Sequence, residues 1–64
     1  MNNTRNTHEN TNNIARYWHG AGWYAYDSKG EYHWVGSMLS YPYLGAAWIE
    51  AERRNLSRPI YLSQ

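Results

Sequence analysis

Three histidines are the residues of this chain best suited to metal binding: His8, His19 and His33. Three imidazoles can hold zinc, usually when they lie at helical spacing or have carboxylate support. Here each histidine belongs to a different segment of the chain, and His33 fits an ordinary position in a strand. The spacing therefore predicts neither a metal site nor a cofactor.

Two carboxylates, Asp27 and Glu31, flank a turn-like segment and form the closest acidic pair. Paired carboxylates do acid–base work when their environments drive their pKa values apart. At a turn both should be solvated, and Asp is explained there by hydrogen bonding to the turn backbone. The serines lie in expected turns and caps without a nucleophile elbow, and the glycines do not form a phosphate-binding loop. We expect no catalytic residues and no enzyme activity.

The composition is that of one small domain rich in Trp and Tyr. The 64 residues include four Trp, seven Tyr, no Phe and no Cys, so disulfides and thiolate metal sites are excluded. Domains of this size need an unusually dense core or another chain. Trp and Tyr carry a polar group on a large ring, which suits half-buried and interface positions. The net charge of +1 is low for a dedicated nucleic-acid binder and favours association.

Residues 1–13 are mostly Asn and Thr and have no apolar residue after Met1. Such a segment cannot bury enough surface to offset its ordering entropy, so we predict a disordered tail followed by one domain over residues 14–64. The chain start lacks the apolar core of a secretory signal, and the apolar run over residues 44–49 is too short to span a membrane. These features predict a cytoplasmic protein without a membrane partner.

A β-hairpin over residues 22–37 is the firmest structural prediction. Asp27 to Gly30 fits a type I turn followed by a glycine at positive φ. This turn fixes the cross-strand pairs as Tyr26 with Tyr32, Ala25 with His33, Tyr24 with Trp34, and Trp23 with Val35. Opposite residues share a face, so the first face carries four rings: Tyr24, Tyr26, Tyr32 and Trp34. The second face carries Trp23, Ala25, His33 and Val35.

A helix is predicted over residues 41–54. Ser40 is its expected N-cap and Pro42 falls in its first turn. The core-facing stripe at helical spacing is Leu44, Ala47, Trp48 and Ala51. Asn55 is the expected residue after the helix end, and Glu50 with Arg54 forms a favourable i,i+4 pair. Gly45 weakens the helix, and its small size would allow a sheet ring to approach closely.

Two further segments are less defined. Aromatic content and following glycines favour a strand over residues 14–19, although Asn13 could instead cap a short helix there. Residues 60–62 could add a strand, restricted by Pro59 to an edge position, or lie over the core. The predicted fold class is α+β: a small antiparallel β-meander of two to three strands packed against one C-terminal helix. The helix can cover only one face of the sheet, and the sequence leaves open which face. The other face must be buried by something else, for which residues 14–19 and 60–62 are candidates, or be used for binding.

The stretch from Gly22 to Asn55 resembles the DNA-binding modules of AP2 domains and of tyrosine-integrase N-terminal arms, which combine a three-stranded sheet with a helix. The matching features are Trp23-Tyr24-Ala25-Tyr26 before a Gly turn, Trp34-Val35-Gly36 ending the next strand, and Ala46-Ala47-Trp48 after a capping Ser. The resemblance implies DNA binding through the sheet. Those families place Arg and Lys on the DNA-facing strands, whereas here only Lys29, in the turn, is basic.

A second resemblance covers residues 22–30, whose Gly-Trp-Tyr-Ala-Tyr-Asp-Ser-Lys-Gly stretch is similar to one unit of the choline-binding cell-wall repeats. Those repeats work in tandem, and this chain contains one copy.

The leading hypothesis for function is a non-enzymatic protein-binding module, a small accessory or inhibitor protein of the kind encoded by phages or mobile elements. It would dock an aromatic face on a larger protein or on its own copy. The predicted contact residues are Tyr24, Tyr26, Tyr32 and Trp34, with Tyr41 and Tyr43 at the margin. The alternative is nucleic-acid binding, through the sheet or by stacking of single strands on the rings, for which the candidate cations are Lys29, Arg53, Arg54 and Arg58.

Overall fold

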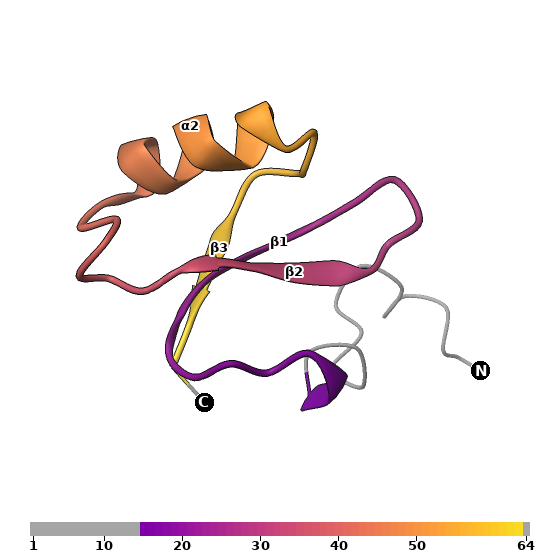
Figure 1. The fold of residues 1–64 in the computed structure, drawn as a ribbon, viewed down its shortest axis with the longest axis horizontal. Coiled ribbons are helices and arrows are strands. Elements are labelled where there is room, and N and C mark those ends of the chain that lie inside the picture. The colour runs from indigo at the N-terminus through magenta and orange to yellow at the C-terminus, as the bar shows by residue number, and fades with distance from the viewer. Residues whose placement is uncertain (1–14, 64) are drawn as a thin grey trace.

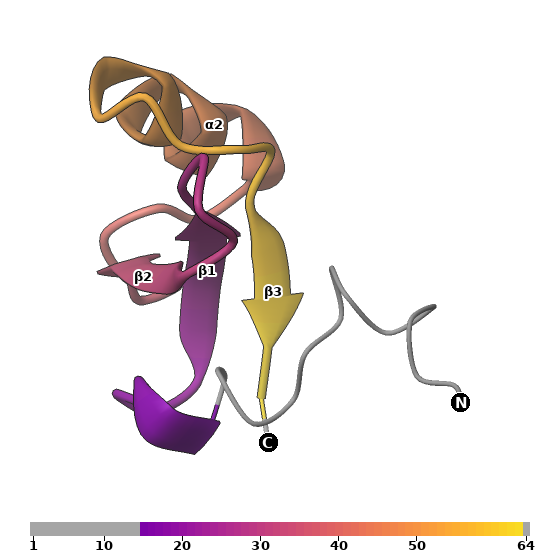
Figure 2. The ribbon, with the colours of Figure 1, turned by 90° about the vertical axis from the view of Figure 1, so that its right-hand side faces the viewer.

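The computed structural model describes residues 15–63, in which a three-stranded antiparallel sheet packs against one helix. The elements are β1 (Gly22–Tyr26), β2 (Tyr32–Gly36), α2 (Leu44–Arg53) and β3 (Ile60–Leu62). The sheet order is β2-β1-β3, so the strand that follows the helix returns to pair with β1 (Figures 1 and 2). The predicted fold class is confirmed. The predicted tail over residues 1–13 lies outside the described residues.

The turn of the hairpin forms as its sequence predicts. Gly30 has φ +84° and donates its N–H to the Asp27 carbonyl at 2.9 Å. The Asp27 carboxylate accepts the N–H groups of Lys29 at 2.8 Å and Glu31 at 3.0 Å. This network accounts for Asp at the first position of the turn.

The predicted register is confirmed for three pairs and wrong for the fourth. Tyr26 pairs with Tyr32, Ala25 with His33 and Tyr24 with Trp34, but Trp23 pairs with Gly36 and not with Val35. A β-bulge therefore makes Val35 an extra residue on β2. The bulge brings Gly36 beside Tyr41, whose ring occupies the space that a Cβ on Gly36 would need.

The third strand is the edge strand that Pro59 permits. β3 pairs antiparallel with β1, with Tyr61 opposite Trp23 and Ile60 opposite Tyr24. Ser57 extends this pairing before the strand begins: its N–H donates to the Tyr26 carbonyl at 2.9 Å and its Oγ accepts the Tyr26 N–H at 3.0 Å. The sequence had placed Ser57 in an ordinary turn, and the structure gives it both backbone groups of Tyr26.

The helix begins later than predicted. Its N-cap is Tyr43, which makes no side-chain cap hydrogen bond, so the expectation that Ser40 caps it is wrong. Ser40 instead belongs to a turn in which its N–H donates to the Ser37 carbonyl at 3.1 Å. That turn takes up the residues that the sequence pattern had assigned to the first helical turn.

The end of the helix is predicted correctly. Asn55 has φ +61°, in the left-handed region that Asn tolerates. The Leu56 N–H donates to the Ala51 carbonyl at 2.8 Å, and the Asn55 N–H donates to the Glu52 carbonyl at 3.0 Å. This pair of hydrogen bonds is a Schellman motif, which satisfies two carbonyls of the last turn.

The helix packs on the face that carries Trp23, Ala25 and Val35. These residues form one buried cluster with Ala47 and Ala51 of α2, and Tyr41, Leu44 and Leu56 pack against it. Trp48 was expected in this stripe but is 39% exposed. Gly45 lies on the exposed side of the helix, so the idea that it admits a sheet ring is wrong; a Cβ there would meet only the Tyr43 ring, at 3.6 Å.

The segment over residues 14–19 was favoured as a strand, and the structure contradicts this. Residues 15–17 form a short helical turn, and the Trp18 N–H donates to the Ala15 carbonyl at 3.4 Å. The chain then reverses at Gly20, which has φ +110°. These residues do not extend the sheet because they cross one of its faces. Within residues 15–63, no helix is long and apolar enough to cross a membrane.

Candidate functional site

The four-ring face of the hairpin lies opposite the helix and is only partly accessible. The side chains of Tyr24 and Tyr32 are 0% and 3% exposed, whereas Tyr26 and Trp34 are half-buried. The rings pack edge to face, with centroids 5.3 Å apart for Tyr24 and Trp34 and 5.5 Å apart for Tyr26 and Tyr32. Such pairs stabilise the sheet itself.

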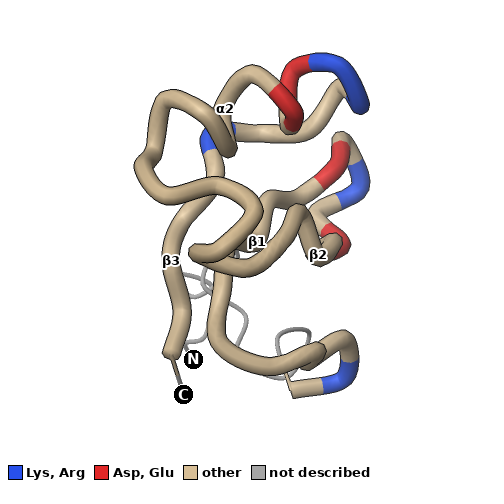
Figure 3. The backbone as a smooth tube through the Cα atoms, turned by 60° about the vertical axis from the view of Figure 1, so that its left-hand side comes forward, with Lys and Arg blue, Asp and Glu red and all other residues tan. Residues whose placement is uncertain are grey.

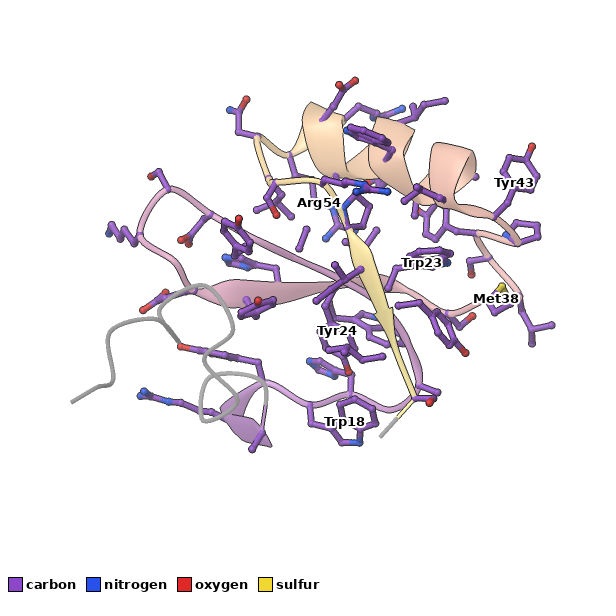
Figure 4. All side chains as sticks on the ribbon, turned by 180° about the vertical axis from the view of Figure 1, so that it is seen from behind. Trp18, Trp23, Tyr24, Met38, Tyr43 and Arg54 are labelled. Carbon is purple, nitrogen blue, oxygen red and sulfur yellow. The ribbon has the colours of Figure 1, made fainter. Side chains whose placement is uncertain are left out.

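The N-terminal strap, residues 15–21, covers this face without a second helix. The Trp18 ring stacks on Tyr24, with centroids 5.5 Å apart and planes 9° apart, and His19 packs against Trp34 (Figure 4). The Tyr24 hydroxyl donates to the Gly20 carbonyl at 2.7 Å and accepts the His19 N–H at 2.8 Å. Tyr24 is therefore a structural anchor, and its hydroxyl explains why a Tyr stands at a fully buried position.

The most exposed apolar surface lies elsewhere, at the connection from β2 to α2. Leu39 is 95% exposed, Tyr43 66% and Met38 40%. Along the outer side of α2, Ile49 is 64% exposed and the Tyr43 ring lies beside Gly45. Residues 35–49 contain no Asp, Glu, Lys, Arg or His. We call this part of the molecule the uncharged end.

The loop that carries Leu39 is held by hydrogen bonds and by the core. The Ser37 carbonyl accepts the N–H of Ser40 at 3.1 Å and of Tyr41 at 2.9 Å, which closes a turn around Leu39. The Trp23 indole donates to the Tyr41 carbonyl at 2.7 Å. Pro42 has a fixed φ and limits the motion of the chain after the turn. A large apolar side chain is thus presented on an anchored turn.

Charge is concentrated away from the uncharged end. Figure 3 shows Lys, Arg, Asp and Glu together at the hairpin turn and at the C-terminal part of α2, while the connection from β2 to α2 carries none. The hairpin-turn end of the sheet is therefore charged, whereas the end that leads into α2 is not. A partner of the uncharged end would displace water without stripping the solvent from a charged group.

Three of the four predicted cations contact another side chain. The Arg54 guanidinium donates to Glu50 at 3.0 Å, to the Trp34 carbonyl at 3.0 Å and to the Val35 carbonyl at 3.4 Å. Arg53 lies 3.7 Å from Glu50, and the Arg58 guanidinium lies 5.4 Å from the Trp48 ring centroid. Lys29 stands in the hairpin turn between two acidic residues. The structure does not gather these four side chains into one basic surface.

His33 contacts the carboxylate of the hairpin turn. His33 Nε2 lies 2.9 Å from Asp27 Oδ2 on the exposed surface. This hydrogen bond, together with the backbone N–H of Glu31, lowers the pKa of Asp27 from 3.8 to about 2. Over residues 15–63 no three His, Cys, Asp or Glu side chains come together as a metal site. The pair therefore stabilises the hairpin turn.

Sequence reasoning identified the rings but missed the residues exposed at the loop. Of the six predicted contact residues, Tyr43 is well exposed, Tyr26, Trp34 and Tyr41 are half-buried, and Tyr24 and Tyr32 are buried. Leu39 and Met38 were not predicted. The sequence carries one signal for them: residues 35–49 contain no charged residue. This run is longer than the set of residues that one buried helix face requires, so part of it must be exposed. Whether any of the six rings contacts a partner stays a prediction.

Comparison with known proteins gives no relative: no family model, no curated protein and no solved structure matches this chain. The likeness to DNA-binding sheet-and-helix modules and to choline-binding repeats therefore gains no support from these comparisons.

Proposed function

We propose that this chain is a non-enzymatic protein-binding module, of the small accessory or inhibitor type, that uses its uncharged end. The observation that carries the proposal is Leu39, which is 95% exposed on a turn anchored to Trp23 through the Tyr41 carbonyl. Exposed loop tips are usually polar, and an apolar side chain held there costs solubility unless a partner covers it.

The proposal moves the contact surface from the four-ring face to the uncharged end. Of the predicted rings, Tyr43 belongs to this surface. Tyr41 lies beneath it, and its ring packs on Gly36. Tyr and Met are enriched at protein interfaces, and an apolar side chain that enters a pocket forms the kind of central anchor found in binding hot spots. Leu39 is the anchor, with Met38 and Tyr43 as the flanking contacts.

Site-specific photo-crosslinking tests this proposal. A benzophenone amino acid replaces Leu39 in one variant and Lys29 in the other, because both stand at exposed chain reversals. In cells of the source organism, the probe at residue 39 should give a protein adduct that the probe at residue 29 does not. Equal adducts from both positions, or adducts with nucleic acid alone, would contradict the proposal.

Nucleic-acid binding is the alternative function, and the charge arrangement does not favour it. Arg54 is occupied by two backbone carbonyls of β2, and Arg53 shares Glu50 with it. Fluorescence anisotropy with labelled duplex and single-stranded DNA at two salt concentrations decides between the two functions. We expect no binding at low salt; binding with a steep salt slope that weakens in Arg58→Ala would establish the alternative.

A further inference from the structure

The core of this domain is small for a chain without covalent staples. Between residues 15 and 63 the buried hydrophobic residues are seven, and three of them are alanine. The same part of the chain exposes eight large hydrophobic side chains. The sequence has no cysteine, and the described residues hold no metal cluster, so neither of these common staples supports residues 15–63; association would bury further apolar surface.

We infer that the partner of the uncharged end is a second copy of this chain, joined across a twofold axis. This inference rests on the proposed function and names its partner. In such an isologous dimer each copy uses the same surface, and Leu39 lies next to the twofold axis, so that the two Leu39 side chains pack against each other. The interface consists of four exposed side chains from each copy: Met38, Leu39, Tyr43 and Ile49.

The available area agrees with a weak dimer. The four side chains are 40–95% exposed, so they offer on the order of 500 Å² together if a large side chain has about 150–250 Å² of surface. Two copies would bury about 1,000 Å², which is the lower bound of specific interfaces. An interface of this size is typical of weak or transient association.

Charge favours a second copy over the other occupants. Two copies of a charged surface would repel each other across a twofold axis, but residues 35–49 carry no charge. A membrane surface would be recognised with the help of basic residues beside the apolar ones. The arginines next to this surface are bound to Glu50, to β2 or to Trp48, so they do not form a basic border.

Sedimentation equilibrium of the full chain over a concentration series tests the dimer. We expect the average mass to rise from one to two copies, and Leu39→Asn to move the midpoint at least tenfold higher in concentration. Ile60→Asn is the matched control, because Ile60 is exposed and apolar but lies on β3. The control should leave the midpoint unchanged.

The absence of cysteine allows a second, independent measurement. Leu39→Cys should form a disulfide-linked dimer under mild oxidation at least tenfold faster than Lys29→Cys, although both positions are exposed. This measurement uses folded protein at concentrations near the sedimentation midpoint. It remains informative if the Asn variant loses structure.

Three results would overturn the dimer. They are a single-copy mass at all concentrations up to about 1 mM, equal oxidation rates for the two Cys variants, and Leu39-dependent binding to neutral phosphatidylcholine vesicles without self-association. A monomer that still gives a heterologous protein adduct at residue 39 would refute the dimer and leave the proposed function standing. Failure of both experiments would remove the proposed function as well.

Discussion

The two faces of the sheet are covered by different means. On one face, α2 places Ala47 and Ala51 against Trp23, Ala25 and Val35, so small helix residues let the backbones approach. On the other face, the rings are covered by the N-terminal strap and by one another. The strap lacks a helical stripe and is held by the hydroxyl of Tyr24, which bonds to two of its backbone groups.

This difference shows how a short chain can bury more rings than one helix covers. A Tyr at a central strand position fills the space beneath the strap and also supplies the polar group that orients it. The sequence allowed residues 14–19 or 60–62 to cover the aromatic face that the helix leaves, and in the structure Trp18 and His19 do contact the rings of that face. The apolar surface that remains exposed lies at the end of the sheet and on the outer side of α2.

Removing Tyr24 should have the largest effect. Tyr24→Ala leaves a cavity under the strap and should lower the free energy of unfolding by about 3–5 kcal/mol. Tyr24→Phe keeps the ring and loses both hydroxyl hydrogen bonds, for a loss of about 1–2 kcal/mol. Urea denaturation measures both. Equal stability of Phe and wild-type proteins would show that the hydroxyl does not hold the strap.

Arg54 tests the helix-covered face. Arg54→Lys keeps the charge but loses the planar group that reaches Glu50 and two carbonyls of β2, so the free energy of unfolding should fall by about 1–2 kcal/mol. Arg53→Lys, at a side chain that is 74% exposed, is the control and should change stability by less than about 0.5 kcal/mol. A similar loss in both variants would show that general electrostatics, and not the contact with β2, matters.

Trp18 tests the covering strap directly. Trp18→Ala removes the stacked ring and should cost about 1 kcal/mol, since stacked pairs contribute about 0.5–1.5 kcal/mol. The same change should increase hydrogen exchange at the His19 N–H while the exchange of β1 is unaltered. Arg16→Ala is the control within the strap. Unchanged exchange at His19 would show that the ring does not hold the strap in place.

Replacing Gly45 should stabilise α2. Gly45→Ala places a methyl group on the exposed side, in ordinary contact with the Tyr43 ring, and should raise the free energy of unfolding by up to about 1 kcal/mol. Thermal unfolding followed by circular dichroism measures the gain. A loss of stability would instead mean that the Tyr43 ring cannot adjust.

The smallest expected effect is the pH dependence of the stability contributed by the hairpin turn, which connects β1 and β2. The pKa of Asp27 is lowered from 3.8 to about 2 in the folded state, so its contribution is complete above pH 3.8 and is lost as the pH falls through 2. Asp27→Asn removes this titration. The difference in stability between the two proteins should shrink as the pH falls below about pH 4.

The sequence predicts most of the hairpin and the end of the helix because local chemistry decides them. Gly30 and Asp27 fix the turn, and Asn55 with Leu56 closes α2. The bulge at Val35 could not be read from the sequence, because the turn and the alternation alone predict a continuous register; in the structure the Tyr41 ring lies over Gly36. The start of the helix was also missed, since Ser40 fits both an N-cap and the turn that it joins.

The candidate site was less predictable than the fold. Ring type and alternation place Tyr24 and Trp34 on one face correctly, but they do not reveal what crosses that face. Residues 14–19 lack a clear period, so their role as a strap depends on long-range contacts with Tyr24 and Trp34. The exposure of Leu39 follows from a turn that the sequence had read as the start of a helix.

The contact between Arg54 and β2 affects whether a strand from another molecule can pair with β2. β2 lies at one border of the sheet, and two of its carbonyls already accept hydrogen bonds from the helix. A strand from another molecule would have to displace the guanidinium before it could add to that border. Indefinite growth of the sheet into fibres is thereby hindered on this side, even though the strand itself is rich in residues that aggregate readily.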